Sequence, residues 1–257
     1  MKFEKFFPSV ALMPFVKEFL IIESDLETGN NLLPDTSIVM AFRYMGNVQN
    51  EEGEKKEAIP ASAITGLRRS ARRLFYSKAT ANLLVVFNEG GTAAFSRIPA
   101  HELFGLTISS ENVFLSAELN EILERLAEAQ TNRDRVDIVE AFLLRKLINT
   151  KPVCLIDNAI QLIKARSGII RMKDLAVSLH ISQDAFEKRF RTLIGSTPKQ
   201  YASIIRLRNL IGKYPTYASL TEASYEAGYF DQSHFIKEFR QFTGRAPKDF
   251  FKSSVYW

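Results

Sequence analysis

The sequence predicts an α+β protein with two domains, a mainly antiparallel β domain followed by an all-α domain. From residue 3 to about 106, short apolar or alternating runs are separated by turn residues, as expected of antiparallel strands. From residue 151 on, apolar residues recur with helical periodicity, and one pattern occurs twice. Residues 1–150 hold 17 Lys and Arg against 20 Asp and Glu, whereas residues 151–257 hold 17 against 9. We therefore expect one domain at 1–150 and another at 151–257.

The first domain is predicted to consist mainly of short strands. Its apolar runs lie at 15–22, 37–44, 58–67, 83–87 and 92–98, and the pairs Gly46-Asn47 and Gly90-Gly91 mark turns between them. This spacing favours a mainly antiparallel sheet that closes as a sandwich or barrel. Residues 47–57 are polar and charged without an apolar period. We expect a mobile loop there.

Two helices are predicted after the strands, at 116–129 and 134–148. Each has its apolar residues on one face, so the pair can pack on the barrel or on a second subunit. Pro152 disfavours helix at Lys151, which places the domain boundary near 150–152. The second domain then begins with a helix at 156–165, which Gly168 ends.

Residues 171–250 contain one motif twice, with a constant offset of 49 residues, for example from Gly195 to Gly244. Each copy predicts a helix of about three turns, with Ser182 or Asp231 as its N-cap and a glycine as its left-handed stop. A shorter amphipathic segment and a tight turn precede each helix, which is the helix-turn-helix pattern. The matching positions are Phe186, Lys188, Phe190, Arg191, Gly195, Pro198, Lys199 and Tyr201 in the first copy and Phe235, Lys237, Phe239, Arg240, Gly244, Pro247, Lys248 and Phe250 in the second.

The second helix of each copy has an aromatic face and a polar face. At 100° per residue, Phe186 and Phe190 share one face of the first helix, as Phe235 and Phe239 do in the second. The opposite faces are polar with basic residues, which a DNA major groove accepts. A helix at 197–212, with Pro198 at its first position, is long enough to hold the two units at a fixed separation.

These residues resemble the double helix-turn-helix of the AraC/XylS family of bacterial transcription regulators. The segments "ISQDAFEKRFRTLIGSTPKQYASIIRLR" (181–208) and "AGYFDQSHFIKEFRQFTGRAPKDF" (227–250) carry the resemblance. The segments at 32–42, 83–95 and 101–106 are similar to a cupin-like N-terminal barrel found in one AraC-like subgroup. The resemblance implies a regulator that binds double-stranded promoter DNA, with a small-molecule effector, a homodimer partner, and RNA polymerase if it is an activator.

The resemblance also places candidate DNA contacts on both helices. They are Gln183, Asp184, Glu187, Lys188 and Arg191 in the first helix and Gln232, Ser233, His234, Lys237 and Arg240 in the second. In the first helix, Asp184 and Glu187 lie four residues before Lys188 and Arg191, so surface ion pairs compete with base contacts. In the second helix Lys237 and Arg240 have no such acid, although Glu238 lies one turn after His234. We therefore expect the second helix to contribute more to DNA binding.

Two other features have alternative interpretations. The arginines at 68, 69, 72 and 73 are the strongest local charge of the first domain, and they form either a solvated rim or a site for an anionic effector. His180 occupies the turn position that Gly228 takes in the second copy. Because histidine tolerates a left-handed conformation, we expect a strained turn there and no ligand.

Composition excludes several classes of function. Cys154 is the only cysteine, so no disulfide and no cysteine-based metal site can form within the chain. Three scattered histidines give no metal constellation, and we expect no metal and no cofactor. No stretch reaches the ~20 apolar residues that span a bilayer, and Pro8 and Pro14 interrupt the apolar run near the start. We therefore expect a cytoplasmic protein without a membrane partner.

No catalytic residues are predicted, and we expect the protein not to be an enzyme. One alternative is a DNA-binding repair-type enzyme, which needs an activated acceptor cysteine. Cys154 lacks the basic or histidine neighbours that would activate it. A further alternative is a regulator whose N-terminal barrel only oligomerises.

Overall fold

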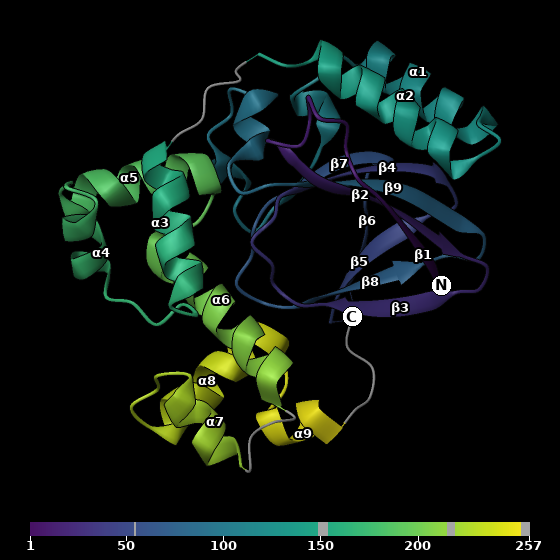
Figure 1. Cartoon of the computed structure of the whole chain (residues 1–257). Helices are drawn as coiled ribbons and strands as arrows, with labels where there is room; N and C mark the ends of the chain where they lie inside the picture. Colours follow the sequence, from purple (N-terminus) through teal and green to yellow (C-terminus); the bar gives the residue numbers. More distant parts are fainter. Residues whose placement is uncertain (54, 149–153, 215–218, 253–257) are drawn as a thin grey trace.

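The computed structural model describes residues 1–53, 55–148, 154–214 and 219–252 (Figure 1). A β domain topped by two helices comes first, and helices α3 to α9 follow at its side. This arrangement confirms the predicted α+β architecture.

The strands form two antiparallel sheets that face each other, as in the expected cupin-like barrel. The six-stranded sheet has the order β1 (Lys2–Phe6), β2 (Val16–Ser24), β9 (Thr80–Phe87), β4 (Val39–Met45), β7 (Ser62–Thr65) and β10 (Thr107–Ser109). The four-stranded sheet has the order β3 (Thr28–Leu32), β8 (Arg72–Tyr76), β5 (Val48–Glu52) and β6 (Lys55–Ala58).

Alternation along the strands lets the six-stranded sheet bury both of its faces. Ile22 on β2 packs with Val48 and Tyr76 of the smaller sheet, whereas its neighbour Ile21 belongs to the larger core on the opposite face. Successive side chains of a strand point to opposite faces, so one strand can contribute to both cores. The apolar runs that predicted these strands are therefore nearly continuous.

Helices α1 (Ser116–Glu128) and α2 (Asn132–Arg145) pack against the six-stranded sheet (Figure 1). Phe142 of α2 contacts Phe42 of β4 edge to face, with ring centroids 6.2 Å apart. Thr131 and Asp134 form a capping box that begins α2. The sequence left two partners open for this helix pair, the barrel and a second subunit. In the structure the pair packs on the barrel.

Two sequence predictions in the β domain were wrong. Residues 47–57 were expected to form a loop, but β5 and β6 form a hairpin there, and β5 also pairs with β8. This hairpin needs no apolar period because backbone hydrogen bonds and the ion pair between Arg73 and Glu51, at 3.1 Å, hold it. The run at 92–98 was expected to be a strand, but it contains the 3-10 helix η1 (Gly91–Ala94). Ala94 and Phe95 are buried by packing and not by strand pairing.

The helical part begins with α3 (Cys154–Ala165) and continues with α4 (Met172–Ser178) and α5 (Gln183–Ile194). Helix α6 (Pro198–Lys213) connects these to α7 (Leu220–Glu226), α8 (Gln232–Thr243) and α9 (Pro247–Lys252). None of the helices in the described ranges is long and apolar enough to cross a membrane.

Two apolar cores organise this part of the chain. Helices α3 to α5 and the start of α6 share one continuous core with the β domain, through residues such as Ile156, Phe186 and Phe190. Helices α7 to α9 and the second half of α6 form a separate core around Phe235 and Phe239. The first helical unit is therefore packed more extensively on the β domain than the second.

Candidate DNA-binding surface

Helices α4 and α5 form the first helix-turn-helix unit. Its turn contains His180 with φ 54°, a left-handed conformation, as expected from its correspondence to Gly228. The Ser182 hydroxyl accepts from the Ala185 amide at 3.4 Å and begins α5, and Gly195 ends it with φ 96°. Phe186 and Phe190 are buried, so the opposite face of α5 points outward.

Helices α7 and α8 repeat this construction. Gly228 is the left-handed turn residue, with φ 74°. The Asp231 carboxylate accepts from the His234 amide at 2.8 Å, and Gly244 ends α8 with φ 76°. Phe235 and Phe239 are buried in the core of this unit. The duplication that the sequence predicts is therefore also a structural duplication.

Helix α6 joins the two units as a single rigid element. It begins with a capping box of Thr197 and Gln200, and its 16 residues span about 24 Å at 1.5 Å per residue. Tyr201, near its start, contacts Phe190 of the first unit at a centroid distance of 5.5 Å. Leu207, two turns further on, lies in the core of the second unit. One helix therefore sets the orientation of both units.

A polar contact also holds α8 against α6. Glu238 accepts hydrogen bonds from Arg206, at 2.7 Å, and from Ser203. The Arg206 guanidinium lies 4.2 Å from the centroid of the Tyr229 ring. His234 Nε2 is 3.9 Å from the Glu238 carboxylate, which is a longer contact. Glu238 therefore serves mainly to tie α8 to α6.

The candidate contact residues lie on the outer faces of α5 and α8. Glu187 is half-buried, and the other candidates are exposed. The exposed candidates are Gln183, Asp184, Lys188 and Arg191 on α5 and Gln232, Ser233, His234, Lys237 and Arg240 on α8. Within the described residues, neither Asp184 with Lys188 nor Glu187 with Arg191 forms an ion pair within 4 Å. The surface ion pairs that competed with base contact on α5 are therefore not formed.

A groove of about 940 Å³ lies between the two recognition helices. Gln183 of α5 and His234 and Lys237 of α8 line it from the two sides, and residues of α6 form its floor. Its cationic lining residues are Arg69, Arg171, Lys173, Lys199, Arg206 and Lys237, and its one carboxylate among the described lining residues is Glu238. The groove therefore attracts anions.

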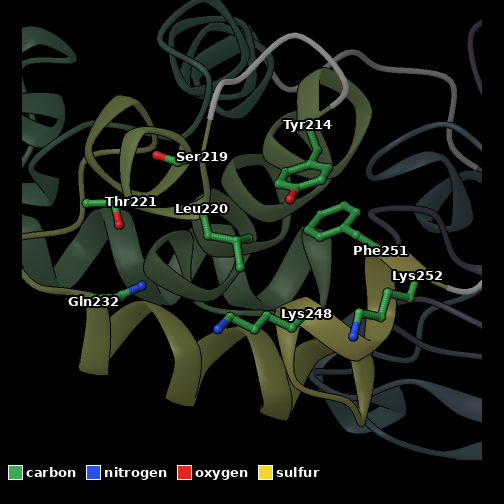
Figure 2. A pocket seen from close by; sticks show the side chains of 8 residues that line it. All are labelled: Tyr214, Ser219, Leu220, Thr221, Gln232, Lys248, Phe251 and Lys252. Carbon is green, nitrogen blue, oxygen red and sulfur yellow. The ribbon is translucent and has the colours of Figure 1, made fainter.

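A second recess, of about 500 Å³, lies beside α8. Figure 2 shows Gln232 of α8 with Lys248 and Lys252 of α9 along one side of this recess. The rings of Tyr214 and Phe251 stack behind them, with centroids 3.5 Å apart. The stacked rings position α9 so that two lysines flank the candidate base contact Gln232.

The residues of the groove floor and the lysines of α9 are functional candidates that were not predicted from the sequence. Arg171 and Lys173 are not among the matching positions of the motif, and Lys199 is one of them but lies outside the recognition helices, so none of the three was selected as a DNA contact. The signal that points to them is the positive charge of residues 151–257, which exceeds what the recognition helices alone contribute.

Two helix-turn-helix units joined by one helix define the protein as a DNA-binding transcription regulator of the helix-turn-helix class. Residues 175–253 match a family described as a helix-turn-helix domain, and residues 4–109 match a domain of unknown function (DUF6597). The match supports the AraC-type helix-turn-helix recognised from the sequence over residues 175–253, and an N-terminal β domain precedes these residues.

The chain is also similar to several solved structures. It is 12% identical to ToxT from Vibrio cholerae over 99% of this chain and 100% of that chain, with a TM-score of 0.48. It is 12% identical to wild-type ToxT from Vibrio cholerae bound to an unsaturated fatty acid, over 93% and 97% of the two chains, with a TM-score of 0.45. The AraC-like transcriptional activator CuxR is 15% identical over 81% of each chain, with a TM-score of 0.29. No curated protein matches the sequence.

Proposed function

We propose that this regulator binds promoter DNA sequence-specifically through α5 and α8, and that it responds to a small molecule. In this proposal residues 151–257 are the DNA-binding domain, and residues 1–150 are the effector-binding and dimerisation domain. The observation that carries it is the placement of two matched, capped helices on either side of one basic groove. Each helix buries its aromatic face and exposes the candidate contacts.

We further propose that α8 contributes more to sequence recognition than α5. The amide of Gln232 can pair with adenine at two points, and Lys237 can donate to guanine or to a phosphate. The outer face of α5 carries the carboxylates of Asp184 and Glu187, which repel the DNA backbone. The lysines of α9 beside Gln232 add attraction at the α8 side only.

A comparison of two double variants tests this asymmetry. DNA fragments that the full-length protein binds in the cell would be recovered by genome-wide mapping and titrated at fixed salt in a gel-shift assay. Gln232→Ala with Lys237→Ala is expected to weaken binding more than Asp184→Ala with Lys188→Ala, because each good two-point base contact contributes ~1–3 kcal/mol of discrimination. Equal losses for the two variants would contradict the asymmetry.

Lys78→Ala is a suitable charge control for Gln232→Ala with Lys237→Ala. Lys78 is exposed in the turn between β8 and β9, and it lines neither the groove nor the recess. Its removal changes the net charge as Lys237→Ala does, so a loss of affinity in Lys78→Ala would mean that overall charge determines binding.

The response to a small molecule is supported by an apolar cavity in the β domain. Met40, Phe87, Ile98, Leu103 and Phe114 are among the residues that line it. Its volume of about 20 Å³ accommodates about one water molecule, so a larger ligand requires the cavity to widen. Widening would displace the end of β9, where Phe87 lies.

That displacement would reach the helical part through Glu89, two residues after Phe87. The Glu89 carboxylate accepts from Lys164 of α3 at 2.7 Å and from Tyr201 of α6 at 2.9 Å. A ligand is therefore expected to raise the melting midpoint of the full chain and to change its affinity for DNA. Ser96→Leu, which adds side-chain volume to the cavity, should abolish both effects. If no metabolite pool changes either quantity, the sensing role is wrong, and light scattering of the full chain then tests a purely oligomeric role.

A further inference from the structure

The groove between α5 and α8 contains one side chain from the β domain. Nineteen of its twenty lining residues lie between Gly168 and Phe242, and the remaining one is Arg69, from the segment before β8. Arg69 is exposed, and no ion pair to it is formed within the described residues. A charge contributed from another part of the chain therefore lines this groove.

Two contacts of neighbouring residues, one through the backbone and one through a side chain, hold the segment that carries Arg69. The Ala71 amide donates to the Phe242 carbonyl of α8 at 2.9 Å. This carbonyl is one of the last four of α8, which have no partner inside the helix. Three residues after Arg69, the Arg72 guanidinium donates to Thr107 at 3.1 Å. Burial, followed by repulsion from Arg68, lowers the pKa of Arg72 to about 10, so Arg72 stays charged and engaged at neutral pH.

The structure thus divides the arginine cluster that the sequence predicts. Arg73 pairs with Glu51 and Arg72 is half-buried against Thr107, whereas Arg69 faces the groove. These three side chains therefore have different surroundings.

The groove carries more positive charge than its own acid neutralises. Glu238 pairs with Arg206. The other cationic lining residues, Arg69, Arg171, Lys173, Lys199 and Lys237, form no ion pair among the described residues. Five unpaired like charges around one open groove favour a polyanion over a single small anion, because DNA presents about one phosphate charge per 1.7 Å of helix axis.

We propose that Arg69 contacts a DNA backbone phosphate, so that the DNA-binding surface extends into the β domain. This inference rests on the proposed function. When α5 and α8 occupy successive major grooves, the phosphates of the intervening minor groove pass across the space between the helices, where Arg69 lies. Arg69 is the only contribution of the β domain to the described groove lining, so the groove stays open to DNA.

The test is the salt dependence of binding by the full chain. The probes are a mapped genomic fragment and a mixed-sequence duplex of about 40 base pairs, or about four helical turns. Each phosphate contact contributes about 0.9 to the slope of log affinity against log salt. Arg69→Ala is therefore expected to reduce this slope by about 0.9 and to weaken binding about five-fold at ~0.15 M salt, equally for both probes. Arg69→Lys should retain most of the affinity.

Matched controls separate this contact from a general effect. Lys78→Ala, at the opposite end of β8, removes the same charge and should leave slope and affinity unchanged. Because Arg69 is exposed, Arg69→Ala should keep the wild-type melting midpoint. The inference is overturned if Arg69→Ala behaves like Lys78→Ala, or if it tightens binding, which would mean that the segment occludes the groove.

Three further outcomes are distinguishable. If inorganic pyrophosphate raises the melting midpoint of the wild type but not of Arg69→Ala, while DNA binding is unaffected, the groove holds a small anion and the inference is wrong. If the wild type binds neither duplex, the proposed function itself fails. If the Lys237→Ala variant loses affinity and Arg69→Ala does not, only the contact by Arg69 is refuted.

Discussion

Glu89→Ala is expected to destabilise the protein by breaking a polar contact between the β domain and two helices. Glu89 follows β9, and its side chain is 17% exposed. Its carboxylate accepts from Lys164 at 2.7 Å, from Tyr201 at 2.9 Å and from Thr36 at 3.1 Å. The substitution removes all three hydrogen bonds at once, and it leaves the buried Tyr201 hydroxyl without this partner.

The expected loss of unfolding free energy is about 1.5–4 kcal/mol. Removing the carboxylate acceptor of the buried Tyr201 hydroxyl costs about 1–3 kcal/mol. The contact with Lys164 adds only about 0.5–1 kcal/mol, because the Lys164 side chain is 40% exposed and solvent screens the pair. Tyr201→Phe removes one donor without leaving a buried group unpaired on α6, so it should cost about 1 kcal/mol.

Urea denaturation followed by circular dichroism measures these losses. Glu124→Ala is the control, because Glu124 is exposed on α1 and forms no ion pair within the described residues. Glu89→Ala combined with Tyr201→Phe should cost less than the sum of the single substitutions, because the two residues share one hydrogen bond. Additive losses, or a loss for Glu89→Ala no larger than that for Glu124→Ala, would refute the assignment of Glu89 as an interdomain contact.

The same contact predicts a pH dependence. Burial alone would raise the pKa of Glu89, but the hydrogen bond and charge of Lys164, together with the hydrogen bond of Tyr201, outweigh it and lower the pKa below 4.5. A carboxyl group with a lowered pKa stabilises the folded state above its unfolded pKa, and this stabilisation is lost as the pH falls through the folded pKa. The stability difference between wild type and Glu89→Ala should therefore be constant well above pH 4.5 and shrink below it. A difference that grows on acidification would show that the sign is wrong.

Other predictions concern the backbone and the cysteine. Gly168→Ala should cost about 2–4 kcal/mol, since Gly168 has φ 79° and an added Cβ would lie 2.2 Å from the Ala202 carbonyl oxygen. Gly244→Ala should cost only about 1 kcal/mol, because its φ of 76° is strained for alanine but nothing lies within 4 Å; thermal denaturation of both variants tests this order. Cys154→Ser should leave DNA affinity unchanged in a gel shift. If Cys154→Ser instead abolished an activity of the protein on DNA, that result would support the repair-type enzyme.

Local signals in the sequence predicted the helical units well. The N-caps Ser182 and Asp231, the stops Gly195 and Gly244, and the aromatic spacing all act within a few residues of the chain. Caps and helical periodicity depend on neighbours up to about four residues away, so they can be recognised without knowing the fold. The same reasoning correctly predicted the connecting helix that begins at Pro198.

Strand pairing was harder to predict because its partners are distant in the chain. Strand β5 pairs with β8, so Gln49 lies opposite Phe75, and nothing in residues 47–57 reveals this partner. The run at 92–98 is apolar because Ala94 and Phe95 are buried, and burial alone does not distinguish a strand from a 3-10 turn.

The sequence by itself determined where each recognition helix begins and ends, which face it buries, and the positive charge of residues 151–257. Only the tertiary structure decided that Gln183, His234 and Lys237 border one groove and that Arg69 joins them from the β domain. It also decided that Glu89 contacts α3 and α6. These contacts join residues more than 40 positions apart in the chain, so they depend on how the cores pack against each other and not on any local pattern.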